Sequence, residues 1–403
     1  MKPSLLAALS LAVLASVSSA QDTTSSAPDT SYIEYHESPI SLPLGIGLRV
    51  PSYDRVNGLT LPWGPRLDLG DEKLQLDALV KYRSNLGKWD PSLEGFVRPS
   101  LSDELRVFVG RGTFTNDSWI HSDLSNSLAA IGVGSDSRNY FRGDRATARL
   151  THTVSSSAIT LTPYIGGNIE RDWSTGSIAP LKSPWSFFGR KGILKMRRPN
   201  PRVEKGRINS LLAGSGIQVA QGAVDGKLDV GFEHSLSTSL EADCSGFITD
   251  AACRRVGQSF NQFTLDSRVS FPTFAGQSFS FIGHAVLTTS DTAPPQRFAY
   301  LGGSGTLATV NLLALGGDRL LFVQGDYIIP INAIVLPYVG SPFLGLRYAA
   351  GNAGEGKLPA LIQNLGVGAG VSFIRVDYTI DPASHRSPNS RKHAFSVGIS
   401  LPM

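Results

Sequence analysis

Apolar and polar residues alternate along many extended segments of this chain. The segment LQLDALVKYR, residues 74–83, places nearly all its apolar side chains on one face and Asp77, Lys81 and Arg83 on the other. Segments 145–154, 227–233, 263–271 and 374–380 repeat the pattern. Because successive side chains of an extended chain point to opposite faces, the alternation predicts strands with one apolar and one polar face.

The length of these segments separates a membrane barrel from a soluble sandwich. Soluble strands usually run about 5–6 residues, whereas membrane strands need roughly 9–11 to cross at a tilt. Most segments here reach the longer value. Aromatic residues lie near segment ends, as interfacial girdles require, and they include Tyr82, Trp89, Tyr164, Phe271 and Phe298. The pattern predicts an all-β fold, a closed antiparallel transmembrane β-barrel.

Turn signals divide the chain into sixteen predicted strands, an even number as single-chain bacterial barrels usually have. The predicted strands are 44–52, 58–69, 73–83, 92–98, 104–111, 145–155, 158–169, 208–221, 226–236, 262–272, 277–288, 319–329, 333–349, 364–371, 373–381 and 393–401. The count depends on a tight turn near Ser372, because one long strand over 365–380 would make it odd. With the N-terminus in the periplasm, short connections face the periplasm and long loops face outward.

Composition agrees with an all-β class and with one large domain. The 403 residues include 42 Gly, 19 Phe and 11 Tyr, and only 17% are charged, which favours strands and turns over surface helices. Residues 1–20 have the layout of a signal peptide, with an apolar run and then Ser18, Ser19 and Ala20. We expect a flexible periplasmic segment at 21–43 and the barrel at 44–403. An ordinary soluble secreted protein is the alternative.

The charge is mild and lies mostly in one loop. A formal charge of +4 does not indicate nucleic acid as a partner. The predicted outer loop 172–207 carries most of the excess, in Arg190, Lys191, Lys195, Arg197, Arg198 and Arg202. Since Arg pairs well with phosphate, we expect this loop to meet outer-membrane lipid, including lipopolysaccharide phosphates. A solvated loop without a fixed partner is the alternative.

Two other outer loops carry local signals. Cys244 and Cys253 lie in one polar segment, and an oxidising compartment permits a disulfide between them. Two thiols alone do not complete a zinc site. In the loop 112–144, Ser122 or Asp123 is an N-cap residue type, and the following apolar residues at helical spacing predict a short helix packed on the barrel rim.

Catalytic motifs are lacking in the sequence. The seven His residues are scattered, none is spaced i, i+4, and no Gly-x-Ser-x-Gly elbow occurs. We therefore predict no enzymatic activity and no cofactor. A hydrolase with a Ser/His/acid group from distant strands is an alternative that spacing does not reveal.

Charges of both signs fall on the predicted lumen face. They are Asp77, Lys81, Arg149, Asp229, Asp266, Arg268, Asp326, Arg375 and Asp377. Mixed charge suits either the water-filled lumen of a passive porin or a salt-bridged, plugged interior.

Residues 294–331 join a Gly-rich loop to a strongly alternating strand. PPQRFAYLGGSGTLATV followed by GGDRLLFVQGDYIIPI resembles the inward-folding loop and next strand of the Omp85 superfamily barrels, the bacterial surface antigen D15 or BamA/TamA-like group. The matching loop residues are Arg297, Phe298, Gly302, Gly303, Gly305 and Asp318. Segments at both ends of the predicted barrel are similar to that family as well.

The resemblance implies a loop that folds inward between strands eleven and twelve. It also implies an outer-membrane location and a role in envelope assembly or in protein or lipid transport, with a periplasmic or envelope protein partner. The family loop bears an Arg at its tip, whereas residues 308–311 here read Ala-Thr-Val-Asn. We therefore expect a less firmly attached loop. We also expect no POTRA repeat before the barrel, which places client insertion in question.

Overall fold

The computed structural model describes residues 40–70, 73–132, 134–175, 198–241, 259–290, 292–337, 340–372, 374–383 and 389–399. These residues belong to one compact unit, Pro39–Met403. The predicted signal peptide and most of the predicted flexible segment lie outside them.

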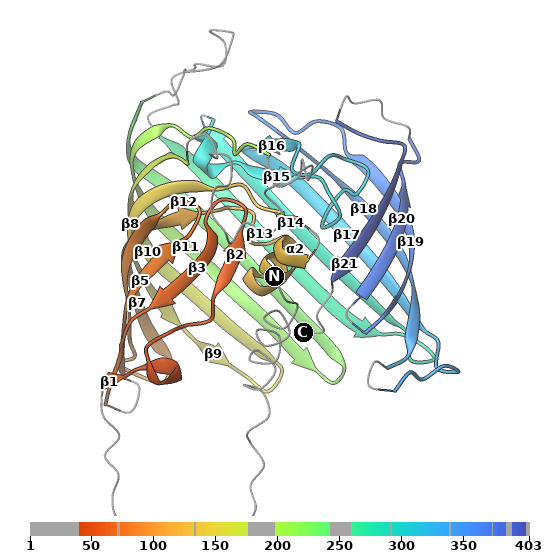
Figure 1. Cartoon of the computed structure of the whole chain (residues 1–403), viewed down its shortest axis with the longest axis horizontal. Coiled ribbons are helices and arrows are strands. Elements are labelled where there is room, and N and C mark those ends of the chain that lie inside the picture. Colours follow the sequence, from red (N-terminus) through yellow and green to blue (C-terminus); the bar gives the residue numbers. More distant parts are fainter. Residues whose placement is uncertain are drawn as a thin grey trace, which may run out of the picture. The chain divides into compact units, whose positions relative to one another are not determined.

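One antiparallel sheet of nineteen strands dominates this unit. Its strands are β1 (Ile40–Ser41), β2 (Ser52–Asp54), β3 (Gly58–Trp63), β4 (Arg66–Leu69), β5 (Leu74–Arg83), β6 (Lys88–Val97), β7 (Asp103–Phe114), β8 (Phe141–His152), β9 (Val154–Ser155), β10 (Ile159–Ser174), β11 (Lys205–Gln221), β12 (Val224–Glu241), β13 (Phe260–Pro272), β14 (Ser278–Ser290), β17 (Arg319–Pro330), β18 (Pro342–Gly354), β19 (Ile362–Val371), β20 (Ile374–Ile380) and β21 (His393–Ile399). Figure 1 shows the sheet curving around an interior.

Three crossings of the barrel wall are each made of two short strands in succession: β1 with β2, β3 with β4, and β8 with β9. β1 pairs with β4 and β2 pairs with β3, while β3 and β4 both pair with β5. β8 and β9 both pair with β10. The described strands therefore make sixteen crossings, as the turn signals predicted. Ser372, with φ 53°, lies in the turn between β19 and β20, so 365–380 is two strands. The predicted strand 333–349 is wrong at its start, because β18 begins at Pro342.

The two faces of the sheet differ in polarity. On β10, Ile165 and Ile169 are 65% and 58% exposed on the outer face, while Asn168, Glu170 and Asp172 are buried on the inner face. Exposed apolar side chains recur on most other crossings. An apolar outer band and a polar interior are the arrangement of a transmembrane barrel, which confirms the predicted fold class.

The two ends of the barrel differ in their connections. At one end, called here the turn end, short turns such as 222–223 and 273–277 join the strands. At the other, the loop end, lie the long connections 115–140 and 291–318. Of the described helices, none has the length and apolar character to span a membrane.

The first and last crossings are the edges of the sheet. β21 pairs with β20, and β1 and β2 pair with β4 and β3. Among the described residues, no ladder pairing joins β21 to the first crossing. Between these edges lies α2 (Asp123–Gly132), which contacts both β2 and β21 (Figure 1). We call this boundary the seam.

The outer face can be tested with a charge. Ile165→Arg should destabilise the barrel by about 2–4 kcal/mol in lipid, because Arg would lie at mid-membrane depth. Thr162→Arg is the control, since Thr162 lies on the inner face beside Gly216 and Asp229, where Arg finds a carboxylate. Denaturant unfolding in vesicles measures both. Equal losses would contradict the assignment of the faces.

Candidate functional site

The interior at the loop end is filled by the connection between β14 and β17. It contains η4 (Pro295–Arg297), β15 (Ala299–Leu301) and β16 (Leu315–Gly317), and β15 and β16 form their own small sheet (Figure 1). Leu301 and Leu307 are fully buried and pack with Phe322 in a cluster on the inner wall. Burial of each such side chain stabilises by about 1.5–3 kcal/mol. We call residues 292–318 the inner loop.

Arg297 attaches the inner loop to the wall by ion pairs. Its Nε and Nη2 each lie 2.8 Å from one of the two carboxylate oxygens of Glu233 on β12, and the same Nη2 also pairs with Glu170 on β10. Arg145 on β8 lies 2.8 Å from Glu170 on that carboxylate's other oxygen. Burial alone would lower the pKa of Arg297, but Glu170 and Glu233 hold it well above its usual value. The guanidinium stays charged.

This attachment differs from the expectation of a loose loop. The tip residues 308–311 carry no Arg, but Arg297 at the start of the loop supplies the cation, bidentate to Glu233. Hydrogen bonds reinforce it, since Gln262 donates to the Arg297 carbonyl at 3.2 Å and Asn116 donates to the Gln296 carbonyl at 2.7 Å. The prediction of weak attachment is wrong because it considered only the tip.

The glycines of the inner loop lie at close approaches. A Cβ on Gly302, which has φ 122°, would lie 2.1 Å from the Asn311 carbonyl oxygen. A Cβ on Gly305 would lie 2.6 Å from Ile120 of another connection. Asp318 is fully buried and accepts hydrogen bonds from the backbone of Ala293 and Gly356 at 3.2 and 2.7 Å. Asp318 therefore closes the base of the inner loop. Phe298, which follows Arg297 in the inner loop, is half-buried.

A second connection, residues 115–140, packs on the inner loop. Trp119 stacks on His284 of β14 with ring centroids 4.0 Å apart, and His284 lies 2.6 Å from Asp266 on β13. The predicted helix is confirmed as α2, where Ser122 accepts the Ser125 N–H as an N-cap.

The predicted apolar face of α2 is only partly buried. Ile131 packs against the cluster of Tyr53 and Ala130, whereas Leu124 and Leu128 are exposed and Asn126 and Ser127 are buried. Asn126 bonds Ser137, and Ser127 accepts the Tyr53 N–H at 3.1 Å. Polar partners therefore orient this helix, and periodicity alone does not report them.

Both edges of the seam are tied to these connections. On the first crossing, Arg55 is fully buried in the β2–β3 turn, and it bonds the carbonyls of Arg138 and Arg198 at 3.1 and 2.6 Å. Beside the last crossing, Asn311 donates to the Asn389 carbonyl at 2.8 Å and Arg391 donates to the Thr309 carbonyl at 2.7 Å. The inner loop thus bonds the segment that leads into β21.

Most predicted lumen charges lie in ion pairs or ring contacts. Asp326 pairs with Arg347 and Arg375 at 2.8 and 3.0 Å, and Arg375 pairs with Asp377 at 2.7 Å. Further contacts join Asp77 to Arg66 at 2.9 Å, Asp229 to Lys227 at 2.8 Å and Asp266 to His284, and Arg149 lies 3.4 Å from the Tyr164 ring centroid. Lys81 and Arg268 are half-buried.

Sequence reasoning missed a second cluster and the partners of Arg297. Asp90 is fully buried between Arg83 and Arg142, with both Arg142 contacts at 2.6 Å. Strand alternation places Arg145 and Glu233 on the inner face, but it does not say which side chains meet across the barrel.

The remaining predicted sites are largely outside the described residues. Cys244, Cys253, Arg190, Lys191, Lys195 and Arg197 lie there. Of the basic loop, Arg198 donates to the Arg138 carbonyl at 2.9 Å, and Arg202 is exposed. Within the described residues no group of three His, Cys, Asp or Glu could hold a metal ion.

No family model matches the chain, and no curated protein matches it. In structure it is similar to BamA from Haemophilus ducreyi lacking POTRA domains 1–3, with a TM-score of 0.52 and 11% identity over 86% of this chain and 69% of that one. It is also similar to CdiB from Escherichia coli (TM-score 0.46, 12%, 90% and 63%) and CdiB from Acinetobacter baumannii (0.44, 13%, 87% and 58%).

These comparisons concern the fold. This chain spans 63% of the Escherichia coli CdiB chain and 58% of the Acinetobacter baumannii one. The likeness to BamA supports the fold of a transmembrane β-barrel.

Removing the cation should release the inner loop. Arg297→Ala removes the partner that buried Glu170 and half-buried Glu233 share and leaves Glu170 with Arg145 alone, and breaking such a buried pair costs about 3 kcal/mol. We expect faster proteolysis within 292–318 and a lower unfolding temperature. The control is Arg111→Ala, which removes an exposed pair with Asp144 worth at most about 1 kcal/mol. If residues 292–318 resisted proteolysis equally in both variants, the attachment of the inner loop through Arg297 would be refuted.

The packing of 115–140 should depend on pH through Asp117. Burial raises the pKa of Asp117 to about 7, although the hydrogen bond from the Asn139 N–H and the charge of Arg198 each lower it. A raised pKa means that the folded state holds the proton, so this stabilisation is full below about pH 4 and is lost as pH rises through about 7. Burial also raises the pKa of Glu204 to about 7, in the same direction. Burial lowers the pKa of His121 to about 4, so its contribution is lost as pH falls below about 6.5.

Asp117→Asn isolates the first contribution, because the amide mimics the neutral acid. Wild-type protein should lose about 2 kcal/mol more stability than the variant between pH 5 and 8. Unfolding at both pH values measures the difference. Parallel pH profiles would show that Asp117 does not titrate in this range.

Proposed function

We propose that this protein is a non-enzymatic bacterial outer-membrane barrel that acts in envelope assembly or in protein or lipid transport, and that its clients engage the seam. The observation that carries the proposal is a filled lumen beside a seam at which, among the described strands, no ladder joins β21 to the first crossing. The edge of a sheet is a template for an added strand.

The filled lumen weighs against a passive porin. The inner loop occupies the loop end of the interior, and ion pairs such as Arg297–Glu170 and Asp90–Arg142 cross the inner wall. In a porin the interior is an open aqueous channel. A ligand path through this barrel requires the inner loop to move first.

The attachment of the inner loop to the β21 side suggests how the lumen and the seam are linked. The backbone bonds of Thr309 and Asn311 to residues 389–391 hold the approach to β21 at the loop end. Movement of the inner loop would break these bonds and free that edge. An envelope protein partner or a client could supply the binding free energy.

Membrane contacts follow from the same proposal. The apolar outer band fits outer-membrane lipid, and the basic residues of 190–202 apart from Arg198, which bonds the Arg138 carbonyl, fit phosphate groups, including those of lipopolysaccharide. The runner-up function is a passive channel, and a hydrolase is the more remote alternative.

Planar bilayers separate the first two functions. Wild-type protein should give little steady conductance, because the inner loop fills the lumen, while Arg297→Ala should give frequent openings. Arg111→Ala should behave as wild type. A large steady wild-type conductance would favour the porin and overturn the proposal.

Client contact at the seam is tested with a photo-reactive phenylalanine analogue at Phe395, an exposed position on β21. Proteoliposomes receive a denatured outer-membrane β-barrel protein as client. We expect cross-links from position 395 and at least about fivefold fewer from Ile165, which lies on the wall away from the edge. Equal yields would count against a client at the seam.

A further inference from the structure

Five adjacent strands, β14 and β17 to β20, present two rows of outward side chains. The pairing register aligns the first row as Phe281, Gly325, Tyr348, Leu365 and Ile380. It aligns the second row as Phe279, Tyr327, Leu346, Val367 and Tyr378. These positions face the membrane, because the alternate residues Asp326, Arg347 and Asp377 point into the lumen.

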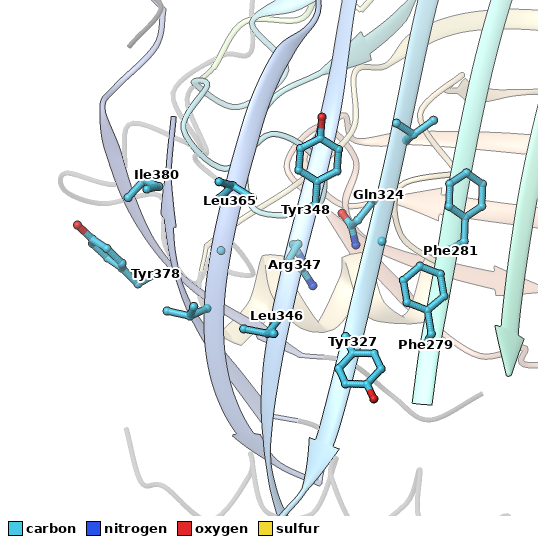
Figure 2. Close-up of a pocket in the computed structure, with 14 residues that line it drawn as sticks. Phe279, Phe281, Gln324, Tyr327, Leu346, Arg347, Tyr348, Leu365, Tyr378 and Ile380 are labelled. Carbon is cyan, nitrogen blue, oxygen red and sulfur yellow. The ribbon is translucent and has the colours of Figure 1, made fainter. Parts of the chain in front are cut away.

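Gly325 leaves a gap in this surface. Its neighbours across the sheet are Phe281 and Tyr348, and Val323 and Tyr327 flank it along β17. A Cβ built on Gly325 would lie 3.2 Å from the Phe279 ring, so the ring leans over the glycine. Gly325 lies within a wide hollow of about 710 Å³ that extends over all five strands, and Figure 2 shows the aromatic side chains around it.

The hollow offers no charge to a ligand. Arg347 and Gln324 also border it, but both side chains bond Asp326, at 2.8 and 2.6 Å. Figure 2 shows them on the far side of the strands from the outward rings. What faces the membrane is hydrocarbon and aromatic surface.

The depth of the hollow follows from Tyr327. Its hydroxyl bonds Gln277 and lies 3.1 Å from the Thr273 hydroxyl, and both residues belong to the turn between β13 and β14. Tyrosine with its hydroxyl among polar groups marks the interface of a membrane. Gly325 lies two residues deeper, about 6–7 Å towards the bilayer centre.

We propose that this hollow binds one acyl chain of a phospholipid from the leaflet at the turn end. The headgroup lies near Tyr327, and the chain runs past Gly325 between Phe281 and Tyr348. The proposal needs only the transmembrane fold and is independent of the proposed function. It places a fixed lipid on β14–β20, where β20 is the strand next to the edge β21.

Packing, rather than the hydrophobic effect, makes an acyl chain prefer the hollow to other positions on the outer face. Bulk lipid is as apolar as the hollow, so transfer of the chain gains little free energy. A chain in the hollow touches rings on several sides instead of mobile neighbouring chains, and these dispersion contacts add up. We expect a preference of about three- to tenfold over other outer positions, with no dependence on the headgroup.

A photo-reactive lipid tests the site. The protein is placed in vesicles of phosphatidylcholine that contain a small fraction with a diazirine in the middle of one chain. Labelled peptides are counted by mass spectrometry. Peptides with Phe279–Phe281 or Leu346–Tyr348 should carry at least about threefold more label than those with Ile165–Ile169. Even labelling of the outer face would overturn the proposal.

Two glycine variants complete the test. Gly325→Leu fills the hollow and should reduce the labelling ratio to about one. Gly95→Leu is the matched control, since Gly95 lies on the outer face of β6, outside the counted peptides, and a Cβ there meets no atom nearer than 3.7 Å. It should leave the ratio unchanged. A ratio that survives Gly325→Leu in folded protein would refute the site.

Two further measurements keep the result interpretable. Gly325→Ala is the smaller change and serves if Gly325→Leu fails to fold, because it requires only a slight shift of Phe279. It should lower the labelling ratio partly. An unchanged labelling ratio would refute the site. Replacing phosphatidylcholine by phosphatidylglycerol should not alter the ratio. A strong headgroup effect would contradict recognition through the chain.

Discussion

The buried pairing of Arg297 with Glu170 and Glu233 is the constraint on which the interior depends. Two carboxylates on β10 and β12 point into a lumen from which much of the water is excluded, and burying them unpaired would cost several kcal/mol. The inner loop supplies the cation that neutralises them. Its apolar residues, Leu301 and Leu307, can then pack against Phe322 on β17. The loop is thus fixed at two places, by charge on one side and by packing on the other.

The same loop connects the lumen to the seam. Backbone bonds from Thr309 and Asn311 reach residues 389–391 before β21, while Arg55 ties the first hairpin to the connection 115–140. Each edge is therefore held through an interior connection rather than by a described ladder between the edges. With this arrangement, separation of the two edges at the loop end depends on the position of the inner loop. If a continuous ladder joined the edges, their separation would depend on the strand pairing alone.

The outer wall repeats this division between packing and charge. Asp326, Arg347, Arg375 and Asp377 neutralise one another inside β17–β20, while the two outward rows of the same strands carry aliphatic and aromatic side chains. A single glycine in that apolar field leaves a hollow instead of a smooth surface. The 11% identity to BamA is consistent with this, because a barrel requires alternation and register but few particular side chains.

Most strands, the number of crossings and the face that most strand side chains take could be predicted from the sequence, since a period of two and turn residues are local properties of the chain. Alternation placed Asp326, Asp377 and Arg375 on the inner face correctly, and the Gly-rich stretch marked the inner loop. It did not predict that Arg297 meets Glu170 and Glu233, that Asn126 rather than Leu124 is buried on α2, or that Gly325 lies between two aromatic rings. Those contacts join strands far apart in the chain, and only the curvature and register of the folded sheet bring them within a few ångströms.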